Sequence, residues 1–358
     1  MPKLDTSKTE WDLSSLSAGD DDPKFAEKRE AIRAANYAFI NKWKDRDDYL
    51  KDPAILKEAL DEYEALERAY GTSGDEGYYF SLRNAQDEDN TELKARSSKI
   101  HDFSLAIVND IQFFTMSVAK ISEADQKKFL DYPPLAPHRH YLEREFVNAK
   151  YLLSESEEKI LNLVGKPSYG NWVDMTSRFV NREEREVTGE DGICSKKNFS
   201  ELLSLISSVK KPVRDEAVGH IHDIMRKYAD VAEAEINSIL ETKKISDDLR
   251  GIKRPDEGRH IADDIDTEVV DALLEAVADR FDIAKRYYAL KARLMGVSKF
   301  AYHERNVPFG SVEKNYSYAD GVAIIRDVFL RLDSQFADIF QQFVESGLVD
   351  VFPKKGKT

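Results

Sequence analysis

The sequence predicts a mainly α-helical protein with one short β-hairpin near residues 184–197. Apolar residues recur every three or four positions along most of its 358 residues. Gly and Pro gather at a few breaks, and only one segment loses the helical period. Long amphipathic helices should therefore make up most of the fold.

The helical period covers most of the N-terminal half. Ser154 and Glu157 have the spacing of a capping box, so a helix should begin there. Pro133, Pro134 and Pro137 mark a loop, because proline lacks an amide donor and disfavours a helical residue before it. The other helices expected in this half lie near 23–48, 53–70, 90–119, 122–131 and 168–180.

The segment that breaks the helical period has the features of a hairpin. Residues 184–188 alternate weakly, residues 189–192 supply turn chemistry, and a second short run follows to Lys197. We predict two antiparallel strands here.

Helical periodicity returns after the hairpin. Helices are expected near 199–208, 211–227 and 229–249. One apolar stripe over 270–288 should be opened by Asp266 as N-cap and closed by Gly296. A second stripe spans one long helix over about 320–346, and its apolar arc is wider than a single interface needs. That width predicts a second packing partner.

Composition excludes several classes of function. The 67 acidic residues exceed the 53 basic ones, so the negative field disfavours nucleic acid as a partner. Cys194 is the single cysteine, which excludes an internal disulfide and favours a reducing compartment. Neither an apolar leader nor a run of about 18 apolar residues occurs, so we expect no membrane partner and a cytoplasmic location.

The sequence contains no recognisable catalytic or metal-binding motif. His303-Glu304 begins like the zinc motif HExxH, but Val307 stands where the second His would be and Pro308 follows. We interpret the pair as a loop dipeptide. We therefore assign no catalytic residue, no metal ligand and no cofactor to this chain.

The loop over 301–309 holds the candidate substrate contacts. Tyr302 offers a hydroxyl donor, and Arg305 and Asn306 precede Pro308 in the same loop. A peptide cleft and a purely structural loop explain Tyr302 equally well.

Several segments, in order, resemble oligoendopeptidase F and its relatives, the thimet-oligopeptidase-like zinc peptidases. Residues 151–161 (YLLSESEEKIL) are similar to the family segment LLSE..EK.L, and residues 302–309 to its YYDRxxPL loop. Further matches in the family order are Pro212-Val213-Arg214, Arg250-Gly251, residues 265–273, residues 286–291, Met295-Gly296, Tyr316-Ser317-Tyr318, residues 347–350 and residues 353–357. His303, Glu304 and Leu348 depart from the residues usual in the family at their positions.

The resemblance implies a helical N-terminal domain over 1–195 and the first, helical part of a zincin-like oligopeptidase domain over 196–358. In the family, HExxH and the third zinc ligand lie beyond the segment that matches residues up to Thr358. The complete protein is expected to bind zinc and to hydrolyse short peptides. This chain is expected to be inactive alone and to associate with its own missing C-terminal catalytic half. The alternative is a non-catalytic helical peptide-binding or scaffold protein derived from that family.

Overall fold

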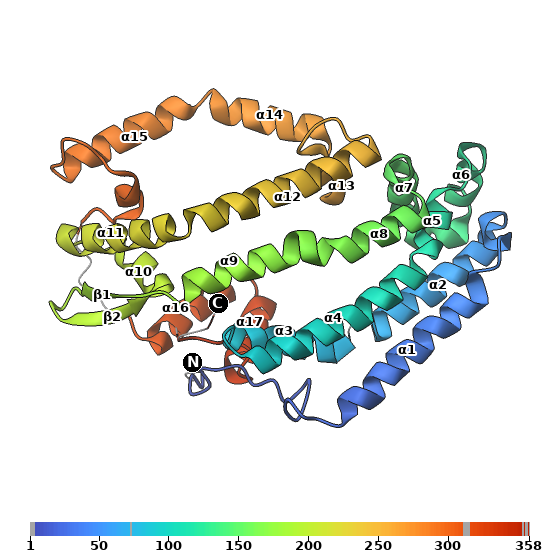
Figure 1. Ribbon diagram of the computed structural model, residues 1–358, viewed down its shortest axis with the longest axis horizontal. Coiled ribbons are helices and arrows are strands. Elements are labelled where there is room, and N and C mark those ends of the chain that lie inside the picture. Colours follow the sequence, from blue (N-terminus) through green and yellow to red (C-terminus); the bar gives the residue numbers. More distant parts are fainter. Residues whose placement is uncertain (1–3, 72–73, 311–315, 353, 355–356, 358) are drawn as a thin grey trace. The chain divides into compact units, whose positions relative to one another are not determined.

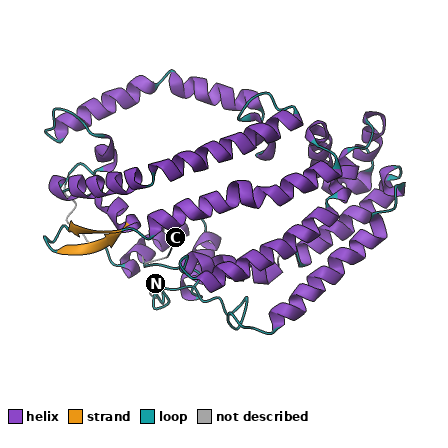
Figure 2. Cartoon of the chain, in the orientation of Figure 1, coloured by secondary structure: helices purple, strands orange, loops and turns teal. Residues whose placement is uncertain are grey.

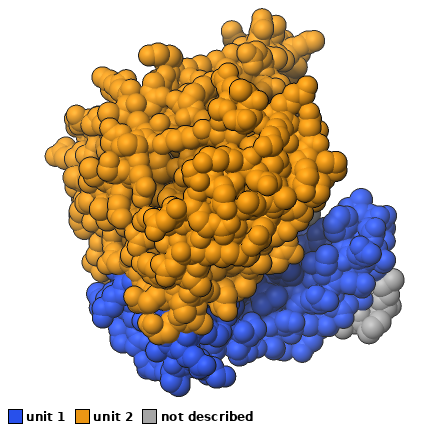
Figure 3. Space-filling model, turned by 90° about the vertical axis from the view of Figure 1, so that its right-hand side faces the viewer, with its two compact units in different colours: residues 1–29, 74–100, 310–358 blue, residues 30–73, 101–309 orange. Residues whose placement is uncertain are grey.

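The computed structural model describes residues 4–71, 74–310, 316–352, 354 and 357. Its regular elements are helices and a single two-stranded sheet within these ranges (Figure 2), which confirms the predicted fold class. The chain divides into two compact units, coloured separately in Figure 3. Unit 1 comprises Met1–Arg29, Gly74–Ile100 and Gly310–Thr358, and unit 2 comprises Glu30–Ser73 and His101–Phe309.

The predicted domain boundary between residues 195 and 196 falls within unit 2, inside the second strand of the sheet. Compactness alone does not define a domain that can fold independently. The division into 1–195 and 196–358 therefore stays a prediction.

Unit 1 packs helices from three separate stretches of the chain. An aromatic cluster forms its centre, with the rings of Tyr79 and Phe80 edge to face at 5.2 Å between centroids. The other buried members are Phe25, Leu93 and Ile100. The elements are the first turns of α1 (Lys24–Trp43) and of α4 (Thr91–Ile111), then α3 (Gly74–Gln86), α16 (Tyr318–Leu332) and α17 (Ser334–Glu345) (Figure 1).

The N-terminal segment of unit 1 is hydrogen-bonded to the segment that follows α17. The Asp12 amide donates to the Gly347 carbonyl at 2.8 Å, and the Val351 amide donates to the Thr9 carbonyl at 2.9 Å. The Trp11 indole Nε1 donates to the Leu348 carbonyl at 3.2 Å. Two short stretches of backbone from opposite ends of the sequence are thus paired.

The first half of unit 2 is a helical bundle around a large apolar core. Trp43, Tyr49 and Phe114 are almost completely buried at its centre. The elements are the rest of α1 and α4, η1 (Asp48–Leu50), α2 (Pro53–Ala69), α5 (Phe113–Ala119), α6 (Glu123–Leu130), η2 (Pro133–His138), α7 (Arg139–Asn148) and η3 (Ala149–Tyr151).

The second half of unit 2 contains the hairpin and the long helices that carry the candidate site. Ser154 and Glu157 form the predicted capping box at the start of α8, each side chain bonded to the other's backbone amide. The elements are α8 (Glu155–Gly165), the π-turn η4 (Lys166–Gly170), α9 (Asn171–Asn181), β1 (Glu184–Thr188), β2 (Cys194–Asn198), α10 (Phe199–Leu205), α11 (Lys211–Lys227), α12 (Ala229–Arg250), α13 (Glu257–Ala262), α14 (Thr267–Ala278), α15 (Phe281–Leu294) and η5 (Tyr302–Asn306).

The hairpin prediction is confirmed. β1 and β2 pair antiparallel, with Glu184 opposite Asn198 and Thr188 opposite Cys194. Val187 points into a small core with Leu202, Ile221 and Ile224, which lie on α10 and α11. This packing fixes the sheet to α11.

Both long apolar stripes are broken into two helices, contrary to the predictions for 270–288 and 320–346. Asp333 is extended, with φ −162° and ψ 137°, and its side chain accepts a bond from the Gln335 amide, so α16 ends and α17 begins there. α14 ends at Ala278 and α15 begins at Phe281. Asp266 is the N-cap residue of α14, as predicted, but its side chain makes no capping hydrogen bond. Gly296 follows the end of α15 with φ 68°, as predicted for the glycine that closes this segment.

Three other local predictions differ from the structure. The segment 90–119 forms two helices, α4 and α5, and the proline cluster forms η2 rather than an open loop. Proline fits there because two of the three prolines stand in the first turn, where no amide donor is needed. The helices α3, α7 and α13 are additions to the helices expected from the sequence.

No helix in the described part of the chain combines the length and the apolar character that a membrane span requires.

We expect Gly347→Ala to lower the free energy of unfolding by about 1–3 kcal/mol. Gly347 has φ 71°, and a Cβ there would lie 3.1 Å from both Asp12 Cβ and Lys8 Cδ. Gly219→Ala is the matched control, since Gly219 lies within α11 with open space where a Cβ would be added. It should raise the free energy of unfolding by about 0.5–1 kcal/mol. Urea unfolding followed by circular dichroism measures the free energy of unfolding of both variants. Equal changes in Gly347→Ala and Gly219→Ala would contradict the prediction.

Candidate functional site

The loop over 301–309 is held in place by a buried ion pair. Glu304 in η5 is 1% exposed, and its Oε1 accepts a hydrogen bond from Arg214 Nη2 of α11 at 2.8 Å. Its Oε2 accepts the Ala301 amide at 3.0 Å, and Lys211 Nζ lies 3.4 Å from Oε1. His303 and Glu304, which we interpreted as a loop dipeptide, lie in the 3-10 helix η5, and Glu304 is a buried partner of Arg214.

These contacts set the ionisation of Glu304. Burial raises the pKa of its carboxyl, and the hydrogen bonds from Arg214 and the Ala301 amide lower that pKa by more, so it lies below the ordinary value. The carboxylate is therefore charged and compensated at neutral pH.

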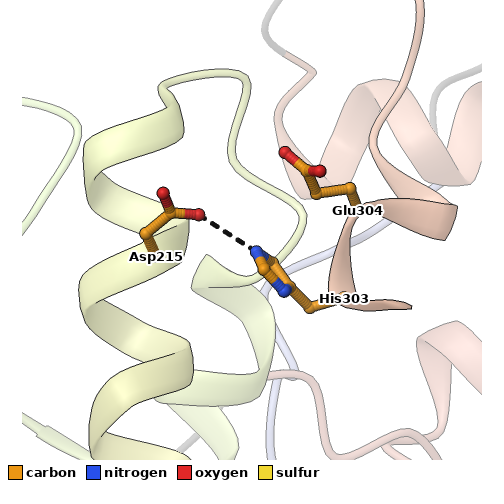
Figure 4. Close-up of side chains that lie close together, drawn as sticks. All are labelled: Asp215, His303 and Glu304. Atoms are coloured by element: carbon orange, nitrogen blue, oxygen red, sulfur yellow. Dashed lines mark hydrogen bonds and ion pairs between the residues drawn. The ribbon is translucent and has the colours of Figure 1, made fainter. Parts of the chain in front are cut away.

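A second contact joins the same loop to α11. His303 Nε2 lies 3.0 Å from Asp215 Oδ1, as Figure 4 shows together with Glu304. Asp215 also accepts from Lys211 Nζ at 2.8 Å. Lys211, Arg214 and Asp215 occupy one face of α11 because they are three and four residues apart.

The three side chains Asp215, His303 and Glu304 are close enough to be tested as a metal site. The donor set does not fit zinc, because both oxygens of Glu304 are already hydrogen-bonded and two cations, Lys211 and Arg214, neutralise the two carboxylates. An added divalent cation would meet these positive charges. We interpret the group as a structural network that fixes the loop.

The structure separates the three candidate substrate residues. The side chain of Tyr302 is 80% exposed, and the Arg305 guanidinium stacks on its ring at 3.9 Å. Arg305 and Asn306 line a cavity of about 380 Å³, whereas Tyr302 is not among its lining residues. Whether any of the three contacts a substrate stays a prediction.

α15 forms the other wall of this cavity. Tyr287, Leu290, Lys291 and Leu294 line it from one helix face. Lys291 is only 6% exposed, and its Nζ donates to the Arg305 carbonyl at 2.6 Å. Val307, Pro308 and Phe309 complete the lining.

Sequence reasoning missed Lys291 and Arg214. Lys291 lies in a helix whose other residues are half-buried or exposed, so no simple pattern marks it as the buried one. The sequence did hold one signal for Lys291. It stands four residues after Tyr287 and directly after Leu290, so it interrupts an apolar helix face. Arg214 has no comparable signal, since its partner is 90 residues away.

A second, larger cavity of about 620 Å³ lies beside α12. Arg250 is part of its wall, but its guanidinium makes two 2.6 Å bonds to Glu158 and one of 3.1 Å to the Tyr151 carbonyl. This cation is already paired within the protein.

We expect Arg214→Met to lower the free energy of unfolding by roughly 3–5 kcal/mol at pH 7, because it leaves the Glu304 carboxylate buried without its main partner. Arg331→Met is the control, since the Arg331–Asp327 pair is exposed and should cost less than about 1 kcal/mol. In the wild-type protein the pKa of the Glu304 carboxyl is lowered by folding. Its contribution to the free energy of unfolding is therefore present above the pKa that Glu304 has in the unfolded chain, and it is lost as the pH falls. The difference between Arg214→Met and wild type should therefore shrink on acidification, and urea unfolding at pH 7 and pH 4 tests this. A pH-independent difference would contradict the assignment.

Comparisons with known proteins agree with the fold. Residues 118–180 match the family described as Oligopeptidase F. Group B oligopeptidase PepB of Streptococcus agalactiae is 20% identical over 98% of this chain and 57% of its own length. An oligoendopeptidase F homolog of Borreliella burgdorferi is 24% identical over 97% of this chain and 57% of its own length.

Among solved structures, oligoendopeptidase F from Enterococcus faecium superposes with a TM-score of 0.71 at 18% identity, over 91% of this chain and 66% of that one. At this identity the likeness establishes a shared fold. The chain spans a little over half the length of these curated relatives. Residues 118–180 thus match the Oligopeptidase F family, and the chain is similar along nearly all of its length to proteins of that name, with which it shares a helical fold.

Proposed function

We propose that this chain is the N-terminal part of a zinc-dependent oligopeptidase that hydrolyses short peptides. The observation that carries the proposal is the alignment of 98% of the chain with only 57% of an oligopeptidase. The 358 residues contain no HExxH, so the zinc ligands are expected in the remaining length of the family. A cytoplasmic location is part of the same proposal.

In this proposal the chain contributes a wall of the peptide cleft. The loop 301–309 is suited to such a role because buried contacts with α11 fix its backbone while Tyr302 and Asn306 stay exposed. Tyr302, Arg305 and Asn306 are the proposed substrate contacts.

The chain alone is proposed to be catalytically inactive. The Asp215, His303 and Glu304 group does not suit zinc, as its charges are already compensated. Without a metal and its general base, neither the nucleophile nor the stabilisation of the transition state is available.

The proposed protein partner is the C-terminal catalytic half of the family. Large apolar side chains are exposed on two helix pairs, which supports a packing partner beyond the described residues. On α14 and α15 they include Val269, Leu273, Phe281 and Ile283, and on α16 and α17 they include Ile324, Leu332, Phe336 and Ile339. The non-catalytic peptide-binding or scaffold protein is the alternative, and activity measurements distinguish the two.

We expect the isolated chain to hold no stoichiometric zinc after dialysis against buffered zinc, because the nearest ligand group is already neutralised by Lys211 and Arg214. Elemental analysis of wild type and His303→Gln is the measurement. One zinc per wild-type chain that disappears in His303→Gln would contradict the prediction and place a metal at this group.

We expect no cleavage of a quenched fluorescent peptide mixture by the isolated chain, and chelator-sensitive cleavage once a separately expressed C-terminal half is added. The polypeptide encoded downstream of the codon for Thr358 is the one to add. Apolar burial at about 25 cal/mol per Å² would drive the association, which sedimentation velocity measures directly. Cleavage by the chain alone, co-purifying through two columns, would contradict inactivity. Peptide binding without cleavage by the combined halves would favour the scaffold alternative.

A further inference from the structure

We infer that the cavity between α15 and the loop 305–309 binds an organic carboxylate that carries an apolar group. The site lies wholly within unit 2. Arg305 and Asn306 are also proposed substrate contacts of the peptidase, but the inference itself rests on the charges and shape of this cavity.

The two walls are held to each other by a direct bond. Lys291 extends from α15, and its Nζ donates to the Arg305 carbonyl at 2.6 Å. The loop is anchored from its other side by the Arg214–Glu304 pair. The cavity walls are therefore fixed before any ligand arrives, which reduces the ordering cost of binding.

The cavity contains positive charge without a matching acid. Lys291 and Arg305 both line it, and none of its described lining residues is Asp or Glu. Neither cation forms an ion pair with a carboxylate of the described residues, whereas the buried Arg214 and the partly buried Arg250 do, with Glu304 and Glu158. The chain as a whole has a net charge of −14, so the positive charge of this cavity lining is opposite in sign to that of the chain.

Lys291 has unused hydrogen-bonding capacity. An ammonium group offers three donors, and within the described residues Nζ has one acceptor, the Arg305 carbonyl. The rings of Tyr287 and Phe300 lie 6.0 and 5.8 Å from Nζ and favour a cation there, but they supply no charge. Burying a cation without a counter-charge is costly, and an incoming carboxylate would supply both the charge and the acceptors.

The rest of the lining selects an apolar body. Leu290, Leu294, Val307, Pro308 and Phe309 line the cavity together with the two basic residues, and Asn306 adds one amide. An inorganic anion would leave these apolar surfaces unused, while the volume of about 380 Å³ suits a small ligand. The C-terminus of a peptide ending in an apolar residue and a free short-chain acid share this chemistry.

Four probes distinguish the sources in a calorimetric titration of the 358-residue chain. They are a tetrapeptide ending in leucine with a free carboxylate, the same peptide as its C-terminal amide, hexanoate, and inorganic phosphate. We expect the free-acid peptide or hexanoate to bind at least tenfold more tightly than both the amide and phosphate. Preference for the peptide identifies a peptide terminus as the ligand, and preference for hexanoate identifies a free acid.

Variants test whether Lys291 is responsible. Lys291→Met should weaken carboxylate binding at least tenfold, and Lys291→Arg should retain most of it. Lys285→Met is the control, because Lys285 is exposed on the same helix and does not line the cavity. Since Lys291→Met also removes the bond to the Arg305 carbonyl, Arg305→Gln provides a second variant that keeps this bond and should still weaken binding.

Two results would overturn the inference. One is equal affinity for the free-acid and amide peptides together with no measurable binding of hexanoate. The other is carboxylate binding that Lys291→Met and Arg305→Gln leave unchanged. Neither result bears on cleavage by the combined halves, so this site and the peptidase proposal can fail separately.

Discussion

The arrangement of the candidate site depends on the buried ion pair between Arg214 and Glu304. Two charges removed from water are stable only when each compensates the other and their remaining polar atoms are bonded. A movement of the loop 301–309 away from α11 would therefore separate the buried Glu304 carboxylate from its main partner. The hairpin supports the same helix, because Val187 of β1 packs against Ile221 and Ile224 of α11.

A chain of contacts extends from this pair to the cavity. Glu304 holds the loop, the loop presents the Arg305 carbonyl to Lys291, and Lys291 binds it to α15. The only buried side chain of α15 is thus a lysine, whereas its large apolar residues are exposed. The bond from Lys291 to the Arg305 carbonyl joins this helix to the loop 301–309, and a lysine as the buried residue is unusual for an amphipathic helix.

Local patterns in the sequence predicted the fold class, most helices, the hairpin and the capping box at Ser154, because these features depend on neighbours within a few residues. The break at Asp333 was missed because both flanking helices continue one apolar stripe, and only the extended backbone of Asp333 separates them. For the site, sequence reasoning proposed the loop 301–309 and three of its residues, whose contact with a substrate stays a prediction. It could not identify Arg214 or Lys291, because the partners of both are brought near by tertiary packing and not by spacing. The family resemblance, in contrast, was readable from the order of short segments, and the comparisons confirm it.

The pairing of Trp11 with the segment after α17 has a consequence for biosynthesis. Trp11 and the Leu348 carbonyl are 337 positions apart, so the N-terminal segment leaves the ribosome long before its partner exists. Unit 2 draws on residues up to Phe309 and can begin to pack earlier, while unit 1 must wait for α16, α17 and the segment after Gly347. A segment translated early is therefore among the last to find its place, and during that interval the Trp11 indole lacks its native acceptor, the Leu348 carbonyl, and is accessible to chaperones and proteases.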